Sequence, residues 1–251
     1  MNNIFTLGAD PEAFLYNTDL EMYVPSELYF HGTKDEPEDL APGYAVLCDN
    51  LMVEFNIPPA STKLDFVANL NQAIEFIQQK LPEEVEIRFN NSAVFSDKAL
   101  QFPTANMFGC APQENMYNIM LLCPDDFPPN VRFAGGHIHV GMKINNLKKM
   151  IKLFDLHIGL PLAAAEPRTE LSRRDIYGAP GTYRTTSYGF EYRTPSCEWL
   201  QSNDKIEWVW DSVERIVEDY HNEGIFLPDD NEVFQAFEQP ELARELIADY
   251  A

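Results

Sequence analysis

Four segments that lie far apart in the chain repeat one arrangement of polar and apolar side chains. In each segment two chemically active residues stand two positions apart and alternate with apolar neighbours. Side chains two positions apart share one face of a β-strand, so each segment predicts a strand with one polar and one apolar face. The polar pairs are Asp10 with Glu12, Glu54 with Asn56, His137 with His139, and Glu191 with Arg193.

If these polar faces belong to one sheet, they form a floor lined with carboxylates and imidazoles. Several carboxylates in close proximity cannot all stay ionised unless positive charge lies among them. A divalent cation supplies that charge, and carboxylate oxygens with one neutral imidazole suit Mg²⁺ or Mn²⁺. Because Mg²⁺ commonly binds together with substrate phosphates, the pattern predicts metal-assisted phosphoryl chemistry.

Each pair has a simpler explanation when it is taken alone. Asp10 and Glu12 suit a solvated edge strand, the two histidines suit hydrogen-bonded positions in a strand, and Glu191 with Arg193 suits an exposed ion pair. We favour the metal site because one explanation then covers four pairs, each opposite a clean apolar face.

Positive charge is concentrated in one part of an acidic chain. The formal net charge is −22, yet six of the nine arginines fall between residues 132 and 193. Such a concentration suits an anion site, although pairing with surface carboxylates explains it equally well. The six are Arg132, Arg168, Arg173, Arg174, Arg184 and Arg193.

The segment 172–196 combines three glycines with four of these arginines. Glycine lets a loop approach a ligand closely, and arginine binds phosphate oxygens with two donors at once. The alternative is a polar loop before an edge strand. We expect a phosphate-binding loop at 172–190, which together with the irregular segment 97–130 covers the site.

Hydrophobic periodicity predicts an α+β fold in which antiparallel strands have helices to one side. We expect helices at 61–82, 146–161 and 204–224, and one or two short helices at 231–250. Ser61 is the expected cap of the first helix, Pro161 ends or kinks the second, and Gly224 is the expected left-handed stop of the third.

Strands are expected in five segments, and the chain as a whole is expected to form one domain. The first strand is interrupted near Pro11, and the second segment forms either one strand or a hairpin. The domain spans 1–251, with its motifs at 6–200 and C-terminal helices at 203–251. The strand segments are 3–16, 44–59, 84–95, 131–144 and 187–196.

Composition excludes several classes of protein. The net charge argues against general binding to nucleic acid or anionic lipid, and no apolar stretch has the length of a membrane span. The N-terminal residues lack a signal-peptide pattern, and the four cysteines lack metal-type spacing, so we expect a cytoplasmic protein with free thiols. The GxxxxGK[ST], GxGxxG and GxSxG motifs are missing, which argues against P-loop, Rossmann, protein-kinase and α/β-hydrolase proteins.

Five motifs, in this order, resemble those of the phage-type carboxylate–amine ligases (amidoligases) of the glutamine-synthetase-like superfamily. The resemblance runs over residues 6–200, and its histidine and Glu-Tyr-Arg motifs are the most specific. It implies a curved antiparallel sheet backed by helices, like the catalytic domain of glutamine synthetase, with the site on the concave face. The motifs are "GADPEAFL", "DNLMVEFNIPPAS", "AGGHIHVG", "RRDIYGAPGTYR" and "YGFEYRTPS".

The resemblance also implies a role for each site residue. ATP and Mg²⁺ (or Mn²⁺) are the implied cofactors. The implied metal ligands are Asp10, Glu12, Glu54, His137 and Glu191. The implied nucleotide contacts are His139, Arg173 and Arg174, and the two histidine roles are exchangeable. The implied catalytic residues are Arg193, which faces the transferred phosphate, Arg184 and Glu191.

The implied activity is ATP-dependent formation of an amide or isopeptide bond through an acyl phosphate, in the cytoplasm of an infected host cell. Two alternatives stay open: a phosphotransferase acting on a guanidino or amine group, and a non-catalytic phage interaction protein. The acid and the amine are either small molecules or part of a peptide or protein.

Glutamine synthetase proper has a small N-terminal domain that completes a neighbouring subunit's site. The chain begins at its first acidic motif, so such a contribution is not expected, and the oligomeric state stays open. Asp49 is only a weak candidate for the general base.

Overall fold

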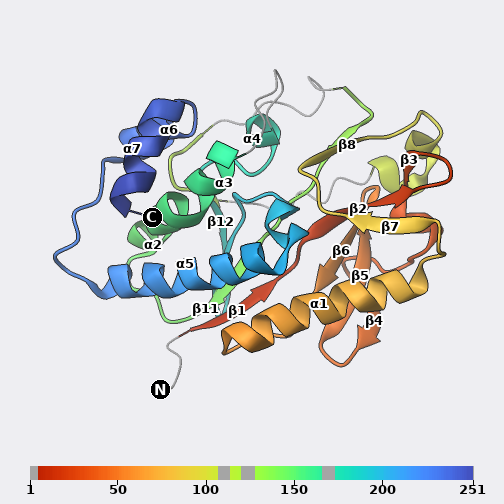
Figure 1. Cartoon of the computed structure of the whole chain (residues 1–251), viewed down its shortest axis with the longest axis horizontal. Coiled ribbons are helices and arrows are strands. Elements are labelled where there is room, and N and C mark those ends of the chain that lie inside the picture. The colour runs from red at the N-terminus through yellow and green to blue at the C-terminus, as the bar shows by residue number, and fades with distance from the viewer. Residues whose placement is uncertain (1–4, 107–113, 120–127, 166–172, 251) are drawn as a thin grey trace.

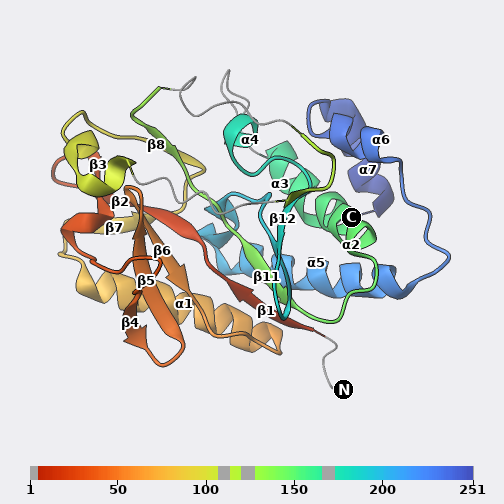
Figure 2. The ribbon, with the colours of Figure 1, turned by 180° about the vertical axis from the view of Figure 1, so that it is seen from behind.

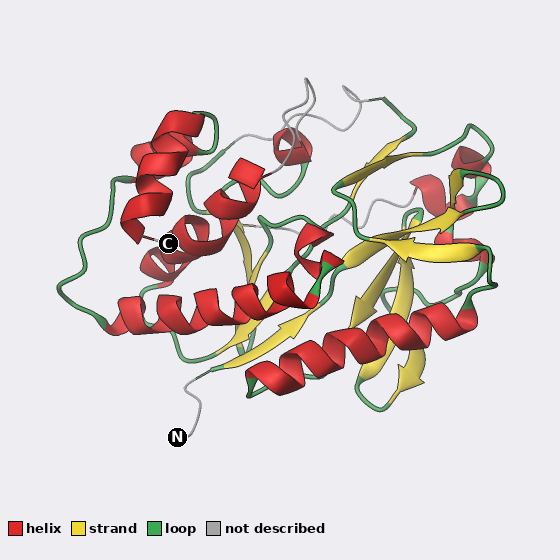
Figure 3. Cartoon of the chain, viewed as in Figure 1, coloured by secondary structure: helices red, strands yellow, loops and turns green. Residues whose placement is uncertain are grey.

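The computed structural model describes residues 5–106, 114–119, 128–165 and 173–250, and its ribbon is shown in Figure 1. Every strand pair that it describes is antiparallel. Helices and strands are not interleaved in regular β/α units but occur in separate parts of the fold (Figure 3). The predicted α+β class is therefore confirmed.

The first sheet has five strands and brings together motifs from three distant parts of the sequence. Its register places Gly8 opposite His139, His139 opposite Glu191, and Glu191 opposite Arg184, so these residues form one row across four strands. The strands, in spatial order, are β1 (Thr6–Ala9), β11 (Ile138–Gly141), β13 (Gly189–Tyr192), β12 (Thr182–Thr185) and β9 (Glu114–Asn115).

The second sheet is built around strand β2, in which Glu12 lies directly opposite Glu54. Its main path, in spatial order, is β3 (Met22–Val24), β2 (Glu12–Asn17), β6 (Met52–Asn56), β5 (Tyr44–Asp49) and β4 (Glu38–Ala41). Strand β7 (Val85–Arg88) also pairs with β2, while β8 (Ser92–Val94) and β10 (Val131–Phe133) form a separate pair.

The two sheets meet where Asp10 and Pro11 separate β1 from β2. The end of β6 spans this junction, because the amide of Ile57 donates to Ala9 O (3.3 Å) and the amide of Phe55 donates to Pro11 O (3.2 Å). The chain passes directly from one sheet into the other at this point, as the red strand in Figure 1 shows. The row of His139, Glu191 and Arg184 in the first sheet and the pair of Glu12 and Glu54 in the second therefore approach the same junction.

Helices α1 (Lys63–Lys80) and α5 (Asn203–His221) lie across one side of the sheets, and the view from behind shows β11 and β12 in front of them (Figure 2). The apolar strand residues Leu7, Val53 and Ile138 are fully buried in one core with Phe66 and Trp210 from these helices. Burial of the apolar strand faces fixes the opposite, polar faces away from α1 and α5.

A second, smaller core lies at the end of the molecule near the C-terminus. It includes Leu156 and Leu160 with Val233 and Leu246. The helical segments here are α2 (Leu147–Phe154), the π-helical turn η5 (Asp155–Gly159), α3 (Leu160–Ala165), α6 (Asp230–Ala236) and α7 (Pro240–Tyr250). The remaining short elements are η1 (Ser26–Leu28), η2 (Ala99–Gln101), η3 (Pro103–Asn106), α4 (Arg173–Ile176) and η6 (Cys197–Gln201).

Several local predictions need correction. The segment 131–144 forms two strands, because Gly136 approaches the backbone of Ser196 so closely that a Cβ would lie 2.3 Å from its carbonyl oxygen. The segment 84–95 is likewise split into β7 and β8. Residues 172–190 are not one loop, since they include α4 and β12. For the segment 44–59, the hairpin alternative is the one present, with Asn50 in the left-handed conformation at its turn (φ 56°).

The helix ends also differ from the prediction. The side chain of Thr62, not Ser61, caps α1 by accepting from the amide of Asp65. Helix α5 ends at His221 with Asn222 as its cap, and Gly224 is not its left-handed stop. Pro161 lies inside α3, just after the π-helical turn, where the regular hydrogen-bond ladder is already interrupted.

Two further expectations concern membrane spans and free thiols. Among the described residues, no helix combines the length and the apolar character that a membrane crossing requires. Cys48 and Cys197 are free thiols, while Cys110 and Cys123 lie outside the described residues.

Candidate functional site

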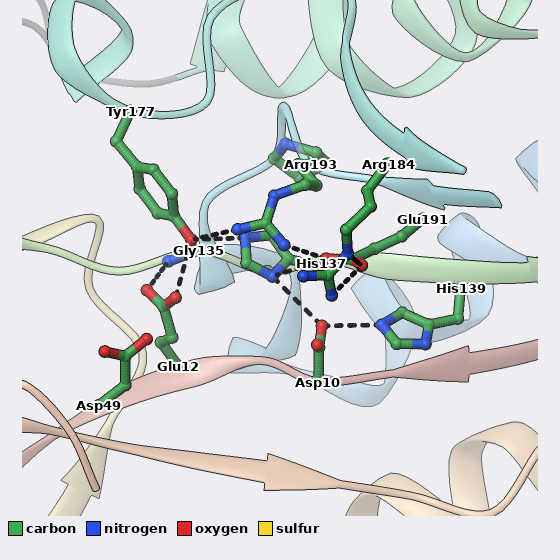
Figure 4. Close-up of polar contacts among 12 residues, drawn as sticks. Asp10, Glu12, Asp49, Gly135, His137, His139, Tyr177, Arg184, Glu191 and Arg193 are labelled. Carbon is green, nitrogen blue, oxygen red and sulfur yellow. Dashed lines mark hydrogen bonds and ion pairs between the residues drawn. The ribbon is translucent and has the colours of Figure 1, made fainter. Parts of the chain in front are cut away.

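The polar rows of the two sheets converge on one site at the junction between β1 and β2 (Figure 4). From the first sheet come His139, Glu191 and Arg184, which share a row across β11, β13 and β12. From the second sheet comes Glu12, and Asp10 lies between the two strands. The expected convergence of these distant residues is therefore present in the structure.

Asp10, His139 and Glu191 form what we term the first ligand group. Each offers one atom, and these atoms lie within 4.8 Å of one another. Nε2 of His139 lies 2.9 Å from Oδ1 of Asp10. It is buried, yet it forms no hydrogen bond with the described residues, because the two atoms are close but poorly aligned. A buried nitrogen and two carboxylates that face a common point are a suitable donor set for a divalent cation.

Glu12, Asp49 and Glu54 form the second ligand group, whose oxygens also lie within 4.8 Å of one another. Burial raises the pKa of Glu54 well above its ordinary value, and the neighbouring charges of Asp10, Glu12 and Asp49 raise it further, while Lys34 opposes them. Burial also raises the pKa of Glu12. These carboxylates repel one another and share a small volume, so a divalent cation among them fits this group as well.

His137 occupies a different position from the one expected for a metal ligand. Its Nδ1 lies 3.2 Å from Oδ1 of Asp10 and 3.5 Å from Oε1 of Glu191, while its Nε2 lies 2.6 Å from the hydroxyl of Tyr177. His139 instead belongs to the first ligand group. The geometry thus favours the exchange of the two histidine roles, with His139 toward the metal. Although burial would raise the pKa of Asp10, His139 and His137 hold it well below its ordinary value.

Tyr177 is a site residue that the sequence reasoning missed. Its hydroxyl donates to Oε1 of Glu12 (2.7 Å), and the amide of Gly135 donates to Oε2 of the same carboxylate (2.7 Å). Burial and the charge of Glu12 raise the pKa of Tyr177 well above its ordinary value. A Cβ at Gly135 would lie 2.4 Å from Nε2 of His137, so a larger residue here would displace the side chain of His137 or Tyr177. Tyr177 lies in the motif "RRDIYGAPGTYR", but only the arginines and glycines of this motif were predicted to bind a ligand.

Arg193 and Arg184 bind opposite sides of Glu191, as expected of residues that share its face of the sheet. Arg193 pairs with Oε1 of this fully buried carboxylate, and Nε of Arg184 donates to Oε2 (2.7 Å). The Nε of Arg193 is buried and forms no hydrogen bond with the described residues. The side chain of Arg184 is 37% exposed. Both guanidinium groups therefore retain donors that a phosphate could use.

The other arginines do not join this cluster in the same way. Arg173 is buried, donates to the carbonyls of Thr194 and Pro195 (2.8 Å each), and lies over the ring of Tyr177. This placement favours support of the site over the nucleotide contact expected for it. Arg174 lies in α4 and is partly exposed.

One arginine of the sequence cluster, Arg132, lies away from this site, and another is not among the described residues. Arg132 is buried and donates to backbone carbonyls, including that of Ala105. Arg168 lies outside the described residues. Arg132 is therefore near the other arginines in the sequence but not in the site, because strand geometry directs its side chain elsewhere.

The curved antiparallel sheet with helices on one side is the fold of a known ligase. It matches the crystal structure of a bifunctional glutathione synthetase from Pasteurella multocida with a TM-score of 0.51 and 13% sequence identity. The match covers 99% of this chain and 47% of that chain, so this chain spans about half the length of that protein. At this identity the similarity shows the fold alone, and it confirms the predicted fold class.

Residues 124–246 match the model of a protein family described as "Phage phiEco32-like COOH.NH2 ligase-type 2". The chain therefore carries a domain of this carboxylate–amine ligase family, and the resemblance inferred from its motifs is confirmed. The matched residues include His137, His139, Glu191 and Arg193, while Asp10, Glu12 and Glu54 precede them. A search of curated proteins found no match.

Proposed function

We propose that the protein is an ATP- and Mg²⁺-dependent ligase that joins a carboxylate to an amine. The observation that carries the proposal is the meeting of two ligand groups, Asp10 with His139 and Glu191 and Glu12 with Asp49 and Glu54, at the junction of the two sheets. Arg184 and Arg193 both pair with Glu191 of the first group. Membership of a carboxylate–amine ligase family supports the same chemistry.

The reaction forms an amide or isopeptide bond in two steps. A carboxylate oxygen of the acid substrate attacks the γ-phosphorus of ATP, the bond to the bridging oxygen breaks, and ADP leaves. The amine nitrogen then attacks the acyl carbon, the carbon–oxygen bond to phosphate breaks, and the amine loses a proton. Divalent ions held by the two ligand groups would supply positive charge for the phosphate oxygens.

Each group of side chains has a distinct task in this scheme. The two ligand groups hold the ions, and Arg184 and Arg193 bind and orient the transferred phosphoryl group through their remaining donors. Tyr177 and the amide of Gly135 fix both oxygens of Glu12. A water-poor site is needed because water would hydrolyse the acyl phosphate, and the buried positions of Glu12 and Glu191 suit this requirement.

The proposal is tested first by binding. Calorimetric titration of the protein with Mg²⁺ and a non-hydrolysable ATP analogue should show binding, and Glu191→Gln should abolish it while circular dichroism shows a folded chain. Glu214→Gln, an exposed position on α5, is the matched control and should bind normally. Failure of the unaltered protein to bind would favour a non-catalytic interaction protein.

The chemistry is tested by its products. Incubation with ATP, a set of carboxylic acids and hydroxylamine should yield a hydroxamate, ADP and phosphate, because hydroxylamine attacks an acyl phosphate. A stable phosphorylated acceptor without a new amide would identify a phosphotransferase instead. The same assay run with amino acids and short peptides as acids would show which substrate class the site accepts.

A further inference from the structure

A pocket of about 340 Å³ lies directly beside the second ligand group. It is enclosed by the segment 30–35, the end of β5 and Thr104 of η3. The lining residues used below are Glu27, His31, Lys34, Asp35, Cys48, Asp49 and Thr104. Its volume is at the lower end of the range for small-molecule sites, which suits a ligand of amino-acid size.

Asp49 belongs both to this pocket and to the second ligand group. Its carboxylate therefore marks the point where the pocket reaches the candidate metal site. A molecule held in the pocket would have one end beside Glu12 and Glu54, whose oxygens lie within 4.8 Å of that of Asp49. The pocket is thus placed to deliver a reacting group to the site.

The charge of the lining favours a cation. The lining includes three carboxylates, Glu27, Asp35 and Asp49, against one ammonium group, that of Lys34, and the imidazole of His31. The charge of Glu27 is held in place by Thr104, whose hydroxyl donates to its Oε2 (2.7 Å) and whose amide lies 3.3 Å from the same oxygen. An anionic ligand would meet an excess of like charge here, whereas an ammonium group would be attracted.

The chain itself places an ammonium group at this position. Nζ of Lys34 lies 3.4 Å from Oδ2 of Asp49, and the lysine side chain is 47% exposed. Because Lys34 lies on the exposed segment 33–37, its side chain can turn toward solvent when another ammonium group arrives.

We infer that this pocket receives the amine substrate, as a primary ammonium group of amino-acid size that replaces Lys34 at Asp49. The inference rests on the proposed ligase function and names the substrate class of that site. The amine is carried either by a free amino acid or by a lysine side chain of a peptide, and the two sources share the chemistry that the pocket recognises.

The test uses Cys48, which lines the pocket, as a reporter of occupancy. Alkylation of Cys48 by iodoacetamide is followed by peptide mass spectrometry on the full chain with Mg²⁺ and the ATP analogue bound. The amine probes are glycinamide and Nα-acetyl-L-lysine methylamide, the neutral control is N-acetylglycinamide, and the anionic control is Nα-acetyl-L-glutamate methylamide. Crystals soaked with the protecting probe should show density beside Asp49.

Two substitutions should change the affinity in opposite directions. Lys34→Ala removes the internal competitor and should strengthen protection by an amine probe about 2–5-fold, while Glu27→Gln should weaken it by a similar factor, the range for partly exposed charge pairs. Lys63→Ala is the matched control, because Lys63 pairs with Asp211 on the helical side of the molecule, away from the pocket.

The outcomes separate this inference from the proposed function. Protection by either amine probe, with the opposite effects of the two variants, supports it, and the probe that protects identifies the source of the amine. Protection by the glutamate probe alone, or by no probe while the ATP analogue still binds, overturns the pocket assignment and leaves the ligase proposal standing. Failure of the ATP analogue to bind counts against the ligase proposal, and the pocket assignment then fails with it.

Discussion

The hydroxyl of Tyr177 lies 2.6 Å from Nε2 of His137. The other ring nitrogen of His137 lies 3.2 Å from Asp10, so the imidazole is held on both sides by protein groups. His139, in contrast, directs Nε2 toward Asp10 without a hydrogen bond to the described residues. His137, whose two ring nitrogens both contact protein groups, orients its neighbours. His139, whose Nε2 has no hydrogen bond to the described residues, is suited to bind an ion.

Tyr177→Phe removes the hydroxyl that donates to Glu12 and contacts His137. The variant should lose about 1–3 kcal/mol of stability, because a buried carboxylate loses a hydrogen-bond donor. Urea denaturation without metal measures this loss, and titration with Mn²⁺ should show weaker binding. Tyr183→Phe on β12 is the control with an unchanged site. Equal effects of the two variants would contradict the assigned role of Tyr177.

Glu54→Gln should stabilise the protein in the absence of metal. Burial and the charges of Asp10, Glu12 and Asp49 raise the pKa of Glu54 well above its ordinary value, so the ionised group disfavours folding near neutral pH. Removal of the charge relieves this repulsion, and thermal unfolding should shift upward by about 2–4 °C for each kcal/mol gained. Added Mg²⁺ should stabilise the unaltered protein more than the variant. A lower melting temperature without metal would contradict the repulsion argument.

Tyr188→Phe should weaken metal binding by about 10-fold or more, the effect typical of a lost hydrogen bond to a metal-binding histidine. The hydroxyl of Tyr188 lies 2.8 Å from Nδ1 of His139, which leaves Nε2 directed at Asp10. Mn²⁺ titration followed by electron paramagnetic resonance measures the affinity. Since Tyr188 is 48% exposed, the stability of the metal-free variant should change little. An unchanged Mn²⁺ affinity would remove His139 from the first ligand group.

Asp155→Asn should change the pH dependence of stability. Burial raises the pKa of Asp155 to about 6, although Tyr192, the amide of Gly181 and Tyr117 donate to its carboxylate. Because the folded pKa exceeds the unfolded value, this group's contribution to stability is complete below about pH 4 and is lost as the pH rises through 6. The loss amounts to about 3 kcal/mol.

The asparagine variant should therefore be the more stable protein at pH 7.5, and the difference should vanish near pH 4. An amide oxygen still accepts from Tyr192 and Gly181, and its NH₂ group can donate to the oxygen of Tyr117. Urea denaturation at several pH values measures both curves. Parallel curves for the two proteins would show that Asp155 keeps an ordinary pKa.

The sequence predicted the site through the two-residue period of the strands. Asp10, Glu12, Glu54, His139 and Glu191 all face the junction because burial of their apolar neighbours leaves their side chains no other direction. The same period could not distinguish His137 from His139. His137 precedes β11, and its environment depends on Tyr177, which is distant in the sequence.

Other features depended on contacts that no local pattern reveals. Asp49 stood near Glu54 in the sequence, but only the hairpin of β5 and β6 brings its carboxylate into the second ligand group. Arg173 resembled its arginine neighbours, yet α4 directs it into the carbonyls of Thr194 and Pro195. The pocket beside Asp49 depends on how the segment 30–35 crosses β5, which has no signature in composition.

The passage of the chain from β1 to β2 through Asp10 and Pro11 has one more consequence. Asp10 belongs to the first ligand group and Glu12 to the second, so the backbone holds these two ligands about 7 Å apart, the interval between alternate residues of an extended chain. Side-chain packing can rearrange as substrates enter and leave, but covalent geometry cannot. Only Pro11 separates Asp10 from Glu12, so insertion of a single residue there would shift one of these carboxylates along the chain and turn it toward the opposite face. The two ligand groups would then no longer meet at the junction.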